Sequence, residues 1–258
     1  LVENLLFFTS LLLILVSILC IFLSCLWAFS DNWLFPDLIP KNLTLNNFLN
    51  LTHDFYFSIW NSIYISLIVS MFSCLIILLW LEITYQINFK SKFLELFFFI
   101  PLLIPDISFL IGISYFFIKY NLNGSFLSLI FIEILYVVPY TYLILEPSFR
   151  NINQKYIYLA KSYQKSNIQI FLSIKLPLIY KTILLAFAVG ILISIGLYTP
   201  VYFIGDGKVS TLTIEIVNLS SNGSRKNLGV STLLQMILPV VTLIIIFFIS
   251  KKFVRWRY

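Results

Sequence analysis

The side chains that carry most enzyme chemistry are scarce in this sequence. Of its 258 residues only 11% are charged, His53 is the single histidine, and the eight glycines are scattered. No metal-ligand cluster and no nucleophile–base pair appears in the sequence, and no glycine-rich run resembles a phosphate-binding P-loop. We therefore expect no cofactor, no metal ion and no enzyme activity in this chain. Any energy that it uses should come from a partner or an ion gradient.

Cysteine is equally scarce, and its placement excludes a disulfide framework. Cys20, Cys25 and Cys74 all lie in hydrophobic stretches without metal-ligand spacing, so we expect them to be buried apolar fillers. Apolar residues dominate instead, because 60% of the sequence is hydrophobic, 18% is aromatic and the mean hydropathy is +0.97. No soluble domain buries that much apolar surface, which predicts a membrane protein.

Six hydrophobic stretches predict an all-α integral membrane protein with six transmembrane helices, each able to cross a bilayer of about 30 Å. They cover residues 5–30, 55–81, 96–118, 126–145, 183–204 and 229–250. The first far exceeds the apolar run of a signal peptide, so we expect an uncleaved span. Pro101 and Pro105 predict a kink in the third span, and Gly190 and Gly196 predict close helix packing in the fifth. The alternation over residues 209–217 is typical of a strand.

The largest basic segment lies between the fourth and fifth spans. We call residues 146–181 the basic loop; it has one acid and six basic residues, Arg150, Lys155, Lys161, Lys165, Lys175 and Lys181. Apolar spacing predicts a short helix around Ile157 and Ala160. Ser166 offers a cap for a second short helix, which Leu176 and Pro177 should end. The loop either rests on anionic lipid or offers a helix pair to a soluble partner.

Residues 156–177 resemble the EAA loop of permeases from binding-protein-dependent type I ABC importers, whose pattern is Glu-Ala-Ala, three residues, Gly, a spacer and Leu-Pro. The matching residues are Ala160 at the second Ala, Ser166 just after the Gly, and Leu176 and Pro177 at the end; Tyr158 replaces the Glu, Leu159 the first Ala and Gln164 the Gly. The resemblance implies that these residues, with Lys161, form a cytoplasmic coupling helix that docks on an ATPase subunit.

The order of parts over about residues 55–250 also resembles this family, especially its polyamine-, thiamine- and iron-type members. The resemblance implies the type I ABC importer permease fold. Residues 1–54 would be an added helix and external loop, residues 55–250 the core, and residues 251–258 a basic cytoplasmic tail. The implied partners are ABC ATPase subunits, a second permease (a copy or a sister chain), an extracytoplasmic solute-binding protein and membrane lipid. The implied cargo is a small cation such as thiamine or a polyamine, or iron.

The distribution of basic residues predicts which side of the membrane is cytoplasmic. With six spans, one side carries two basic residues in the link after the second span, six in the basic loop and four in the C-terminal tail, whereas the other side carries five. Basic residues concentrate on the cytoplasmic side of membrane proteins. We therefore expect both termini and the basic loop in the cytoplasm of a bacterium with this chain in its inner membrane, and we interpret the net charge of +6 in this way and not as a sign of nucleic-acid binding.

Four residues are candidates to line a translocation pathway: Asp106, Glu133, Tyr140 and Asn61. A carboxylate is costly to bury in a bilayer, so Glu133 should face a cavity or a partner, while Asp106 could equally lie among the lipid headgroups. Tyr140 fits packing as well as lining, and Asn61 fits hydrogen bonding between helices as well as cargo contact. A gradient-driven carrier or channel without an ATPase is the alternative, and inverted repeats or more intramembrane charge would favour it.

Overall fold

The computed structural model describes residues 2–31, 33, 37, 39–49, 51, 53–87, 92–221 and 225–255. Within these ranges the secondary structure is helical apart from one isolated β-bridge between Ser30 and Leu43. The all-α prediction is therefore confirmed. The strand expected over residues 209–217 is wrong, because residues 212–217 of that segment lie in helix α12 (Leu212–Ser221).

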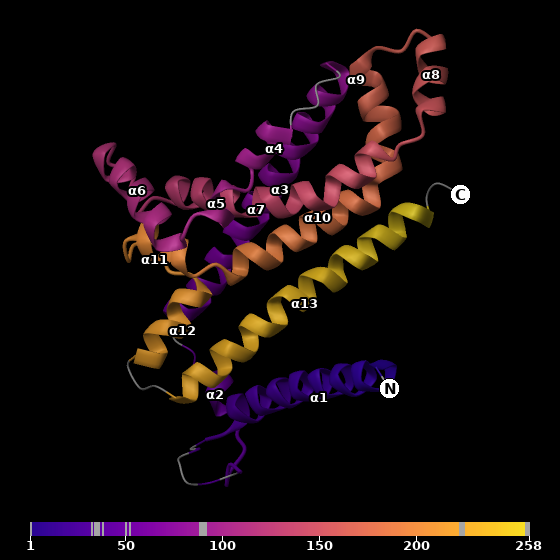
Figure 1. Ribbon diagram of the computed structural model, residues 1–258. Coiled ribbons are helices and arrows are strands. Elements are labelled where there is room, and N and C mark those ends of the chain that lie inside the picture. The colour runs from indigo at the N-terminus through magenta and orange to yellow at the C-terminus, as the bar shows by residue number, and fades with distance from the viewer. Residues whose placement is uncertain are drawn as a thin grey trace.

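Long helices form the body of the molecule, and short ones connect them (Figure 1). In chain order the elements are α1 (Val2–Phe29), α2 (Asn46–Leu49), α3 (His53–Ile87), α4 (Lys92–Phe97), α5 (Ile100–Leu103), α6 (Asp106–Lys119), α7 (Phe126–Arg150), α8 (Gln154–Ser162), α9 (Asn167–Ile170), the π-helix η1 (Phe171–Lys175), α10 (Leu176–Gly196), α11 (Thr199–Gly205), α12 and α13 (Arg225–Arg255). Five described segments are long and apolar enough to cross a membrane: Leu6–Phe29, Phe55–Ile87, Phe126–Arg150, Asn167–Gly196 and Asn227–Phe248.

The third expected span is broken into α4, α5 and α6. The expected kink is a full break, because Pro105 excludes helical geometry at Ile104, whose φ and ψ are −88° and 140°. The segment still follows α7 from one end of that helix to the other. At one end Arg150 Nη2 donates to Glu95 Oε1 of α4 at 2.8 Å, and at the other the Gly124 backbone N–H donates to the Ile204 carbonyl at 2.9 Å.

The core of the bundle is the contact between α3, α7 and α10. A row of buried serines on α3 lets the helices approach closely, and its members are Ser58, Ser62, Ser66, Ser70 and Ser73. Ser70 Oγ donates to the Phe187 carbonyl of α10 at 2.8 Å. A Cβ at Gly190 would lie 2.7 Å from Ser70 Oγ, whereas one at Gly196 would meet nothing within 4 Å. Close packing is therefore confirmed at Gly190 and wrong at Gly196.

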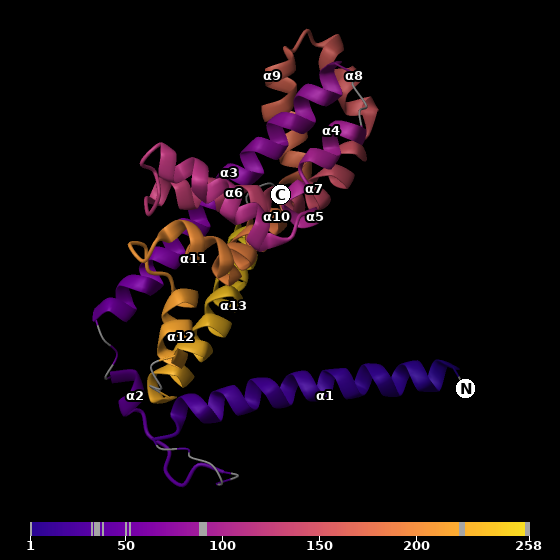
Figure 2. The ribbon, with the colours of Figure 1, turned by 60° about the vertical axis from the view of Figure 1, so that its left-hand side comes forward.

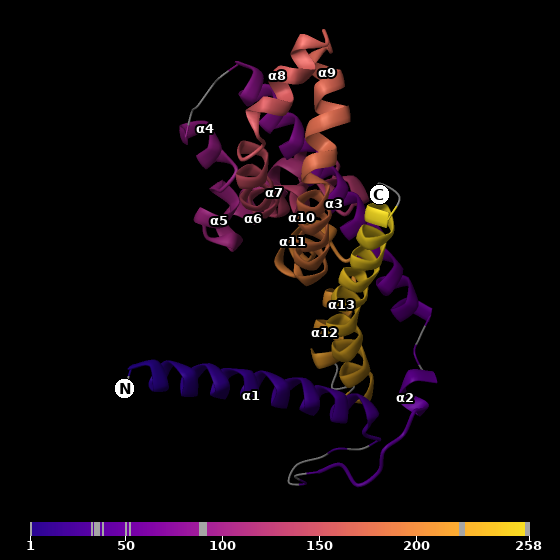
Figure 3. The same cartoon turned by 90° about the vertical axis from the view of Figure 1, so that its right-hand side faces the viewer.

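Helix α1 projects from the rest of the molecule and packs mainly on α13 (Figures 2 and 3). The two helices meet at Gly229, where a Cβ would lie 2.9 Å from the backbone of Trp27. The apolar side chains along α1 are exposed in the single chain, and so is Cys20. The expectation of a buried cysteine is therefore wrong at Cys20 and confirmed at Cys74.

Some of the basic residues counted for the orientation in the membrane lie outside the described part of the structure. Lys90 and Arg257 fall outside the described residues, and so do the side chains of Lys92, Arg225, Lys226, Lys251, Lys252 and Arg255. The sidedness of the chain thus stays a prediction.

Candidate functional site

Helices α8 and α9 extend beyond the ends of α3 and α7 at one tip of the molecule (Figure 1). Asn153 caps α8, since its side chain accepts the Lys155 N–H. At the other end of α8, the Lys165 N–H donates to the Ala160 carbonyl at 3.2 Å and the Gln164 N–H donates to the Lys161 carbonyl at 2.9 Å. This pair of bonds is a Schellman motif, which ends the helix sharply.

Gln164 has the backbone conformation that a glycine would take most easily. Its φ is +55°, in the left-handed region that follows a helix with a Schellman ending. This is the position at which the EAA pattern has Gly. The backbone turn of that pattern is thus present here without the glycine.

The break between the two short helices is where the sequence predicts it. Ser166 forms a capping box with Gln169, in which the Ser166 side chain accepts the Gln169 N–H and the Gln169 side chain accepts the Ser166 N–H. The expected end at Leu176 and Pro177 is wrong, because α9 continues through η1 into α10 as one helical rod. Pro177 comes directly after the π-helix, where the Leu176 N–H donates to the Phe171 carbonyl five residues back, so the regular α-helical hydrogen-bond pattern is already interrupted there.

Lys175, the last residue of η1, points into the protein and not toward lipid headgroups. The residue is 2% exposed, and Nζ lies 2.6 Å from Glu82 Oε2 on α3. The ammonium also lies 3.8 Å from the centre of the Tyr85 ring and 5.1 Å from that of Phe149, in cation–π geometry. Sequence reasoning treated Lys175 as one of six loop charges and missed Glu82, because 93 positions separate the two residues.

Arg150 forms a second, more exposed ion-pair cluster at the start of the loop. Its guanidinium contacts Glu95 of α4 at 2.8 Å and also Glu146 of α7. Two charged anchors thus bracket the segment that contains α8 and α9, one at Arg150 and one at Lys175.

The outer surface of α8 and α9 is apolar, aromatic and basic at once. Ile157 and Ala160 face inward and are buried. The exposed side chains are Tyr156, Tyr158, Leu159, Tyr163, Ile168, Lys155, Lys161 and Lys165. We call this set the tip surface. Tyr158 is 67% exposed and Tyr163 is 74% exposed, so the single chain leaves large rings without cover.

The four pathway candidates do not form one cluster. Glu133 is 1% exposed and accepts a hydrogen bond from Ser194 Oγ of α10. Asp106 is exposed and accepts one from Tyr136 OH at 3.4 Å. Tyr140 lies at the surface, on α7 like Glu133. Asn61 donates to the Ser210 carbonyl at 2.9 Å and so links α3 to the segment before α12.

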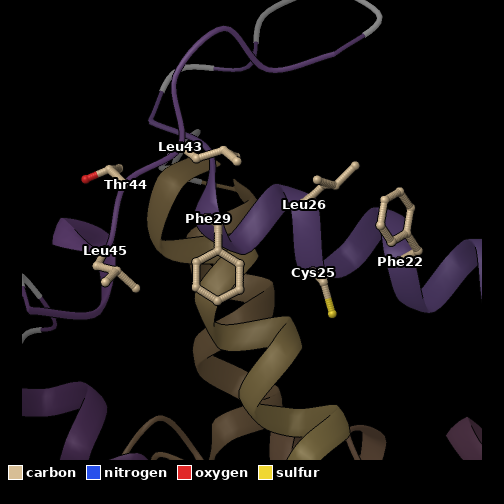
Figure 4. A pocket seen from close by; sticks show the side chains of 7 residues that line it. All are labelled: Phe22, Cys25, Leu26, Phe29, Leu43, Thr44 and Leu45. Atoms are coloured by element: carbon tan, nitrogen blue, oxygen red, sulfur yellow. The ribbon is translucent and has the colours of Figure 1, made fainter.

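None of these four residues lines the pocket of about 360 Å³ between the end of α1 and residues 43–45 (Figure 4). Its lining is Phe22, Cys25, Leu26, Phe29, Leu43, Thr44 and Leu45. With Thr44 as its one hydroxyl among apolar groups and a thiol, the pocket offers little to a charged cargo. No group of His, Cys, Asp and Glu able to hold a metal ion occurs among the described residues.

The model of a family described as "binding-protein-dependent transport system inner membrane component" matches residues 79–257. This chain belongs to that family. The permease is 32% identical over 180 residues to the inner membrane ABC transporter permease protein YnjC of Escherichia coli (strain K12). The match covers 70% of the permease but 33% of YnjC, so the chain spans about a third of that relative's length.

The fold of the permease is also that of a solved importer. It superposes with a TM-score of 0.67 on a chain from the crystal structure of a bacterial ABC transporter involved in the import of the acidic polysaccharide alginate. The alignment covers 98% of the permease and 96% of that chain, at 15% sequence identity. It supports the type I permease fold. The family match also contains Glu82, the basic loop and Lys175.

Proposed function

We propose that this permease forms half of the translocation pathway of an ATP-driven importer and takes up force from a separate ATPase through α8 and α9. One observation carries the proposal: the tip surface exposes aromatic and aliphatic side chains beside lysines at the end of the bundle. Exposed apolar patches of this kind mark partner surfaces. The capped ends of α8 hold that surface as a defined shape, which suits docking in a groove.

The length of α3 supports the placement of this tip outside the bilayer. At about 1.5 Å per residue, the 35 residues of α3 extend roughly 50 Å, against a hydrocarbon core of about 30 Å. The excess at its C-terminal end carries Glu82 and Tyr85 toward α8. Together with the basic count, this favours a cytoplasmic tip with both termini on the same side, in the inner membrane of a bacterium.

The remaining parts of the machine are partners of this chain. A second permease, either a copy or a sister chain, would supply the other half of the pathway, and two ATPase subunits would drive alternating access. An extracytoplasmic solute-binding protein would deliver the cargo. Residues 55–250 would form the permease core, and membrane lipid would surround it. The exposed apolar length of α1 favours cover by lipid or by the second permease.

The carboxylates favour a cationic cargo, such as thiamine, a polyamine or iron. Glu133 of α7 faces α10, where it accepts a hydrogen bond from Ser194. The first residues of α10 directly follow η1. Asp106 of α6 accepts a hydrogen bond from Tyr136, which lies on α7 as Glu133 does. Any sliding of α10 against α7 would expose or cover Glu133, and on this ground we place Glu133 along the pathway. We place Tyr140, which lies on α7, and Asp106, which bonds to Tyr136 of α7, along the same pathway. Asn61 is assigned to helix packing through its bond to Ser210.

A pull-down tests the docking. The permease is purified in mild detergent from its native host, and a co-purifying ABC ATPase is identified by mass spectrometry. Leu159→Asp should lose the ATPase, because it places a carboxylate in the apolar part of the tip surface. Leu122→Asp is the matched control, since Leu122 is an exposed leucine in the turn between α6 and α7, at the end of α7 away from the basic loop.

Two outcomes contradict the docking proposal. One is that the wild-type permease is active in transport but retains no ATPase, which would favour a gradient-driven carrier. The other is that Leu159→Asp and Leu122→Asp retain the ATPase equally.

A further inference from the structure

We propose that Lys175 and Glu82 are positioning residues, which join both short helices of the basic loop to α3 so that a movement of α8 and α9 shifts α3 and α10 together. The inference rests on the proposed function and names the residues that carry force inward from the docking surface. Lys175 is 2% exposed, so its side chain is not accessible to a docking protein. It acts through the groups around it.

The first connection from this pair leads to α9. Glu82 accepts from Lys175 Nζ with Oε2 and from Gln86 Nε2 with Oε1, at 2.6 and 2.8 Å. Gln86 Oε1 in turn accepts from Asn167 Nδ2 at 3.5 Å. Asn167 is the first residue of α9. The chain of contacts therefore joins the start and the end of the α9–η1 segment to one turn of α3.

The second connection leads to α8. The Tyr85 ring lies under the Lys175 ammonium, and its hydroxyl donates to Gln154 Oε1 at 2.6 Å. Gln154 is the first residue of α8. Tyr85 also packs edge-on against Phe149, the residue before Arg150 on α7, with ring centres 6.2 Å apart. One buried ammonium thus lies at the meeting point of α3, α7, α8 and η1.

The physical chemistry of buried charge indicates that this pair serves geometry more than stability. A buried ion pair gains little over apolar residues of the same size, because both charges lose their hydration. It does require one relative placement of the two helices, since either charge left alone is strongly destabilising. The π-helix η1 ends at Lys175, and its wider turn changes the direction in which the residues around it point. Such turns recur at functional sites.

The test uses four variants of the permease in nanodiscs: Glu82→Gln, Lys175→Met, the double variant Glu82→Leu/Lys175→Met, and Lys181→Met as control. Lys181 is an exposed lysine of α10, the helix that continues directly from η1. Hydrogen exchange of residues 154–170 is measured first, on the permease alone. Both single variants should speed exchange in α8 and α9, and Lys181→Met should leave it unchanged.

Coupling is measured next, in liposomes that contain the permease with its co-purifying ATPase and binding protein. The double variant should unfold at the wild-type temperature and retain the ATPase, because its apolar pair packs without stranded charge. It should nevertheless transport less cargo per ATP hydrolysed, by roughly 2- to 30-fold, the range typical of residues that carry coupling between sites.

Three results separate the possibilities. If the single variants leave hydrogen exchange in α8 and α9 unchanged, the positioning role is overturned. If the double variant is as stable as the wild type and also transports the same amount per ATP, the pair is only structural and the inference is overturned. If the wild-type permease retains no ATPase, the proposed function fails, while hydrogen exchange still decides whether Lys175 positions the two helices.

Discussion

At the scale of single residues, the basic loop differs from the EAA pattern at Gln164, and the backbone geometry there explains how the loop forms its turn without glycine. Gln164 takes a φ of +55° where the pattern has Gly. A residue with a Cβ adopts this conformation at a cost of roughly 1–2 kcal/mol. The Schellman bonds from Gln164 and Lys165 hold it there. The turn is therefore a property of the helix end, and glycine only makes it easier to form.

We expect Gln164→Gly to stabilise the end of α8 by about 1 kcal/mol, because glycine takes a positive φ without a steric cost. Hydrogen exchange at the Gln164 and Lys165 amides measures the effect, with slower exchange as the expected result. Gln164→Val is the comparison variant, since a β-branched residue fits this conformation worst. Faster exchange in the glycine variant would mean that the Gln164 side chain itself holds the turn.

Glu133 tests the pathway at the same scale. In the Glu133→Gln variant the side-chain amide can still accept a hydrogen bond from Ser194, so the packing of α7 on α10 is kept while the carboxylate is lost. Uptake of a cationic cargo should fall roughly tenfold, which corresponds to the loss of about 1.5 kcal/mol from one charge-assisted contact. Radiolabelled uptake measures it, and normal uptake by this variant would remove Glu133 from the pathway.

At the scale of elements, helix packing depends on where small residues face each other. Gly190 and Gly196 lie in the same predicted span and led to the same prediction of close packing, yet only Gly190 lies close to a neighbouring helix. The difference lies in α3, where the buried serine row passes Gly190, whereas α10 ends at Gly196 before the turn into α11. Ser70 and Val137 fill the space that a side chain at Gly190 would need.

Gly190→Val should therefore destabilise the bundle by roughly 1–3 kcal/mol, the usual effect of overpacking a core. A lower unfolding temperature of the purified permease in detergent is the measured result. Gly196→Ala is the control on the same helix and should unfold at the wild-type temperature. Equal unfolding temperatures for the Gly190→Val variant and the wild type would show that α3 and α10 are not packed as described.

The elements themselves were largely predictable from hydrophobic runs and caps. The capping box at Ser166 and the turn after α6 follow from side chains within a few positions of each other. Local reasoning failed where a distant contact decides. Pro177 looks like a helix end, but η1 and the buried Lys175 let the rod continue. The alternation over residues 209–217 looks like a strand, but no second strand lies beside it in the described chain, and α12 packs on α13 instead.

At the scale of the whole molecule, the site is a product of tertiary structure more than of motif. Sequence alone located the basic loop and the short helix around Ile157 and Ala160. It could not pair Lys175 with Glu82 or Arg150 with Glu95, because spacing along the chain carries no information on contacts 93 and 55 positions apart. The two ion pairs bring α3, α4, α7 and η1 together at one tip. The other end of α7 adjoins the turn at Gly124, whose backbone N–H donates to Ile204 of α11.

The most direct measurement of the central claim is site-specific photocrosslinking in native membranes, with a photoreactive phenylalanine at Tyr158 or at Tyr120. Both tyrosines are exposed, by 67% and 57%, and they lie on α8 and in the turn after α6. An adduct between position 158 and an ABC ATPase, with none from position 120, is the predicted result. An ATPase adduct from position 120, or none from position 158 in membranes that import cargo, would contradict the account.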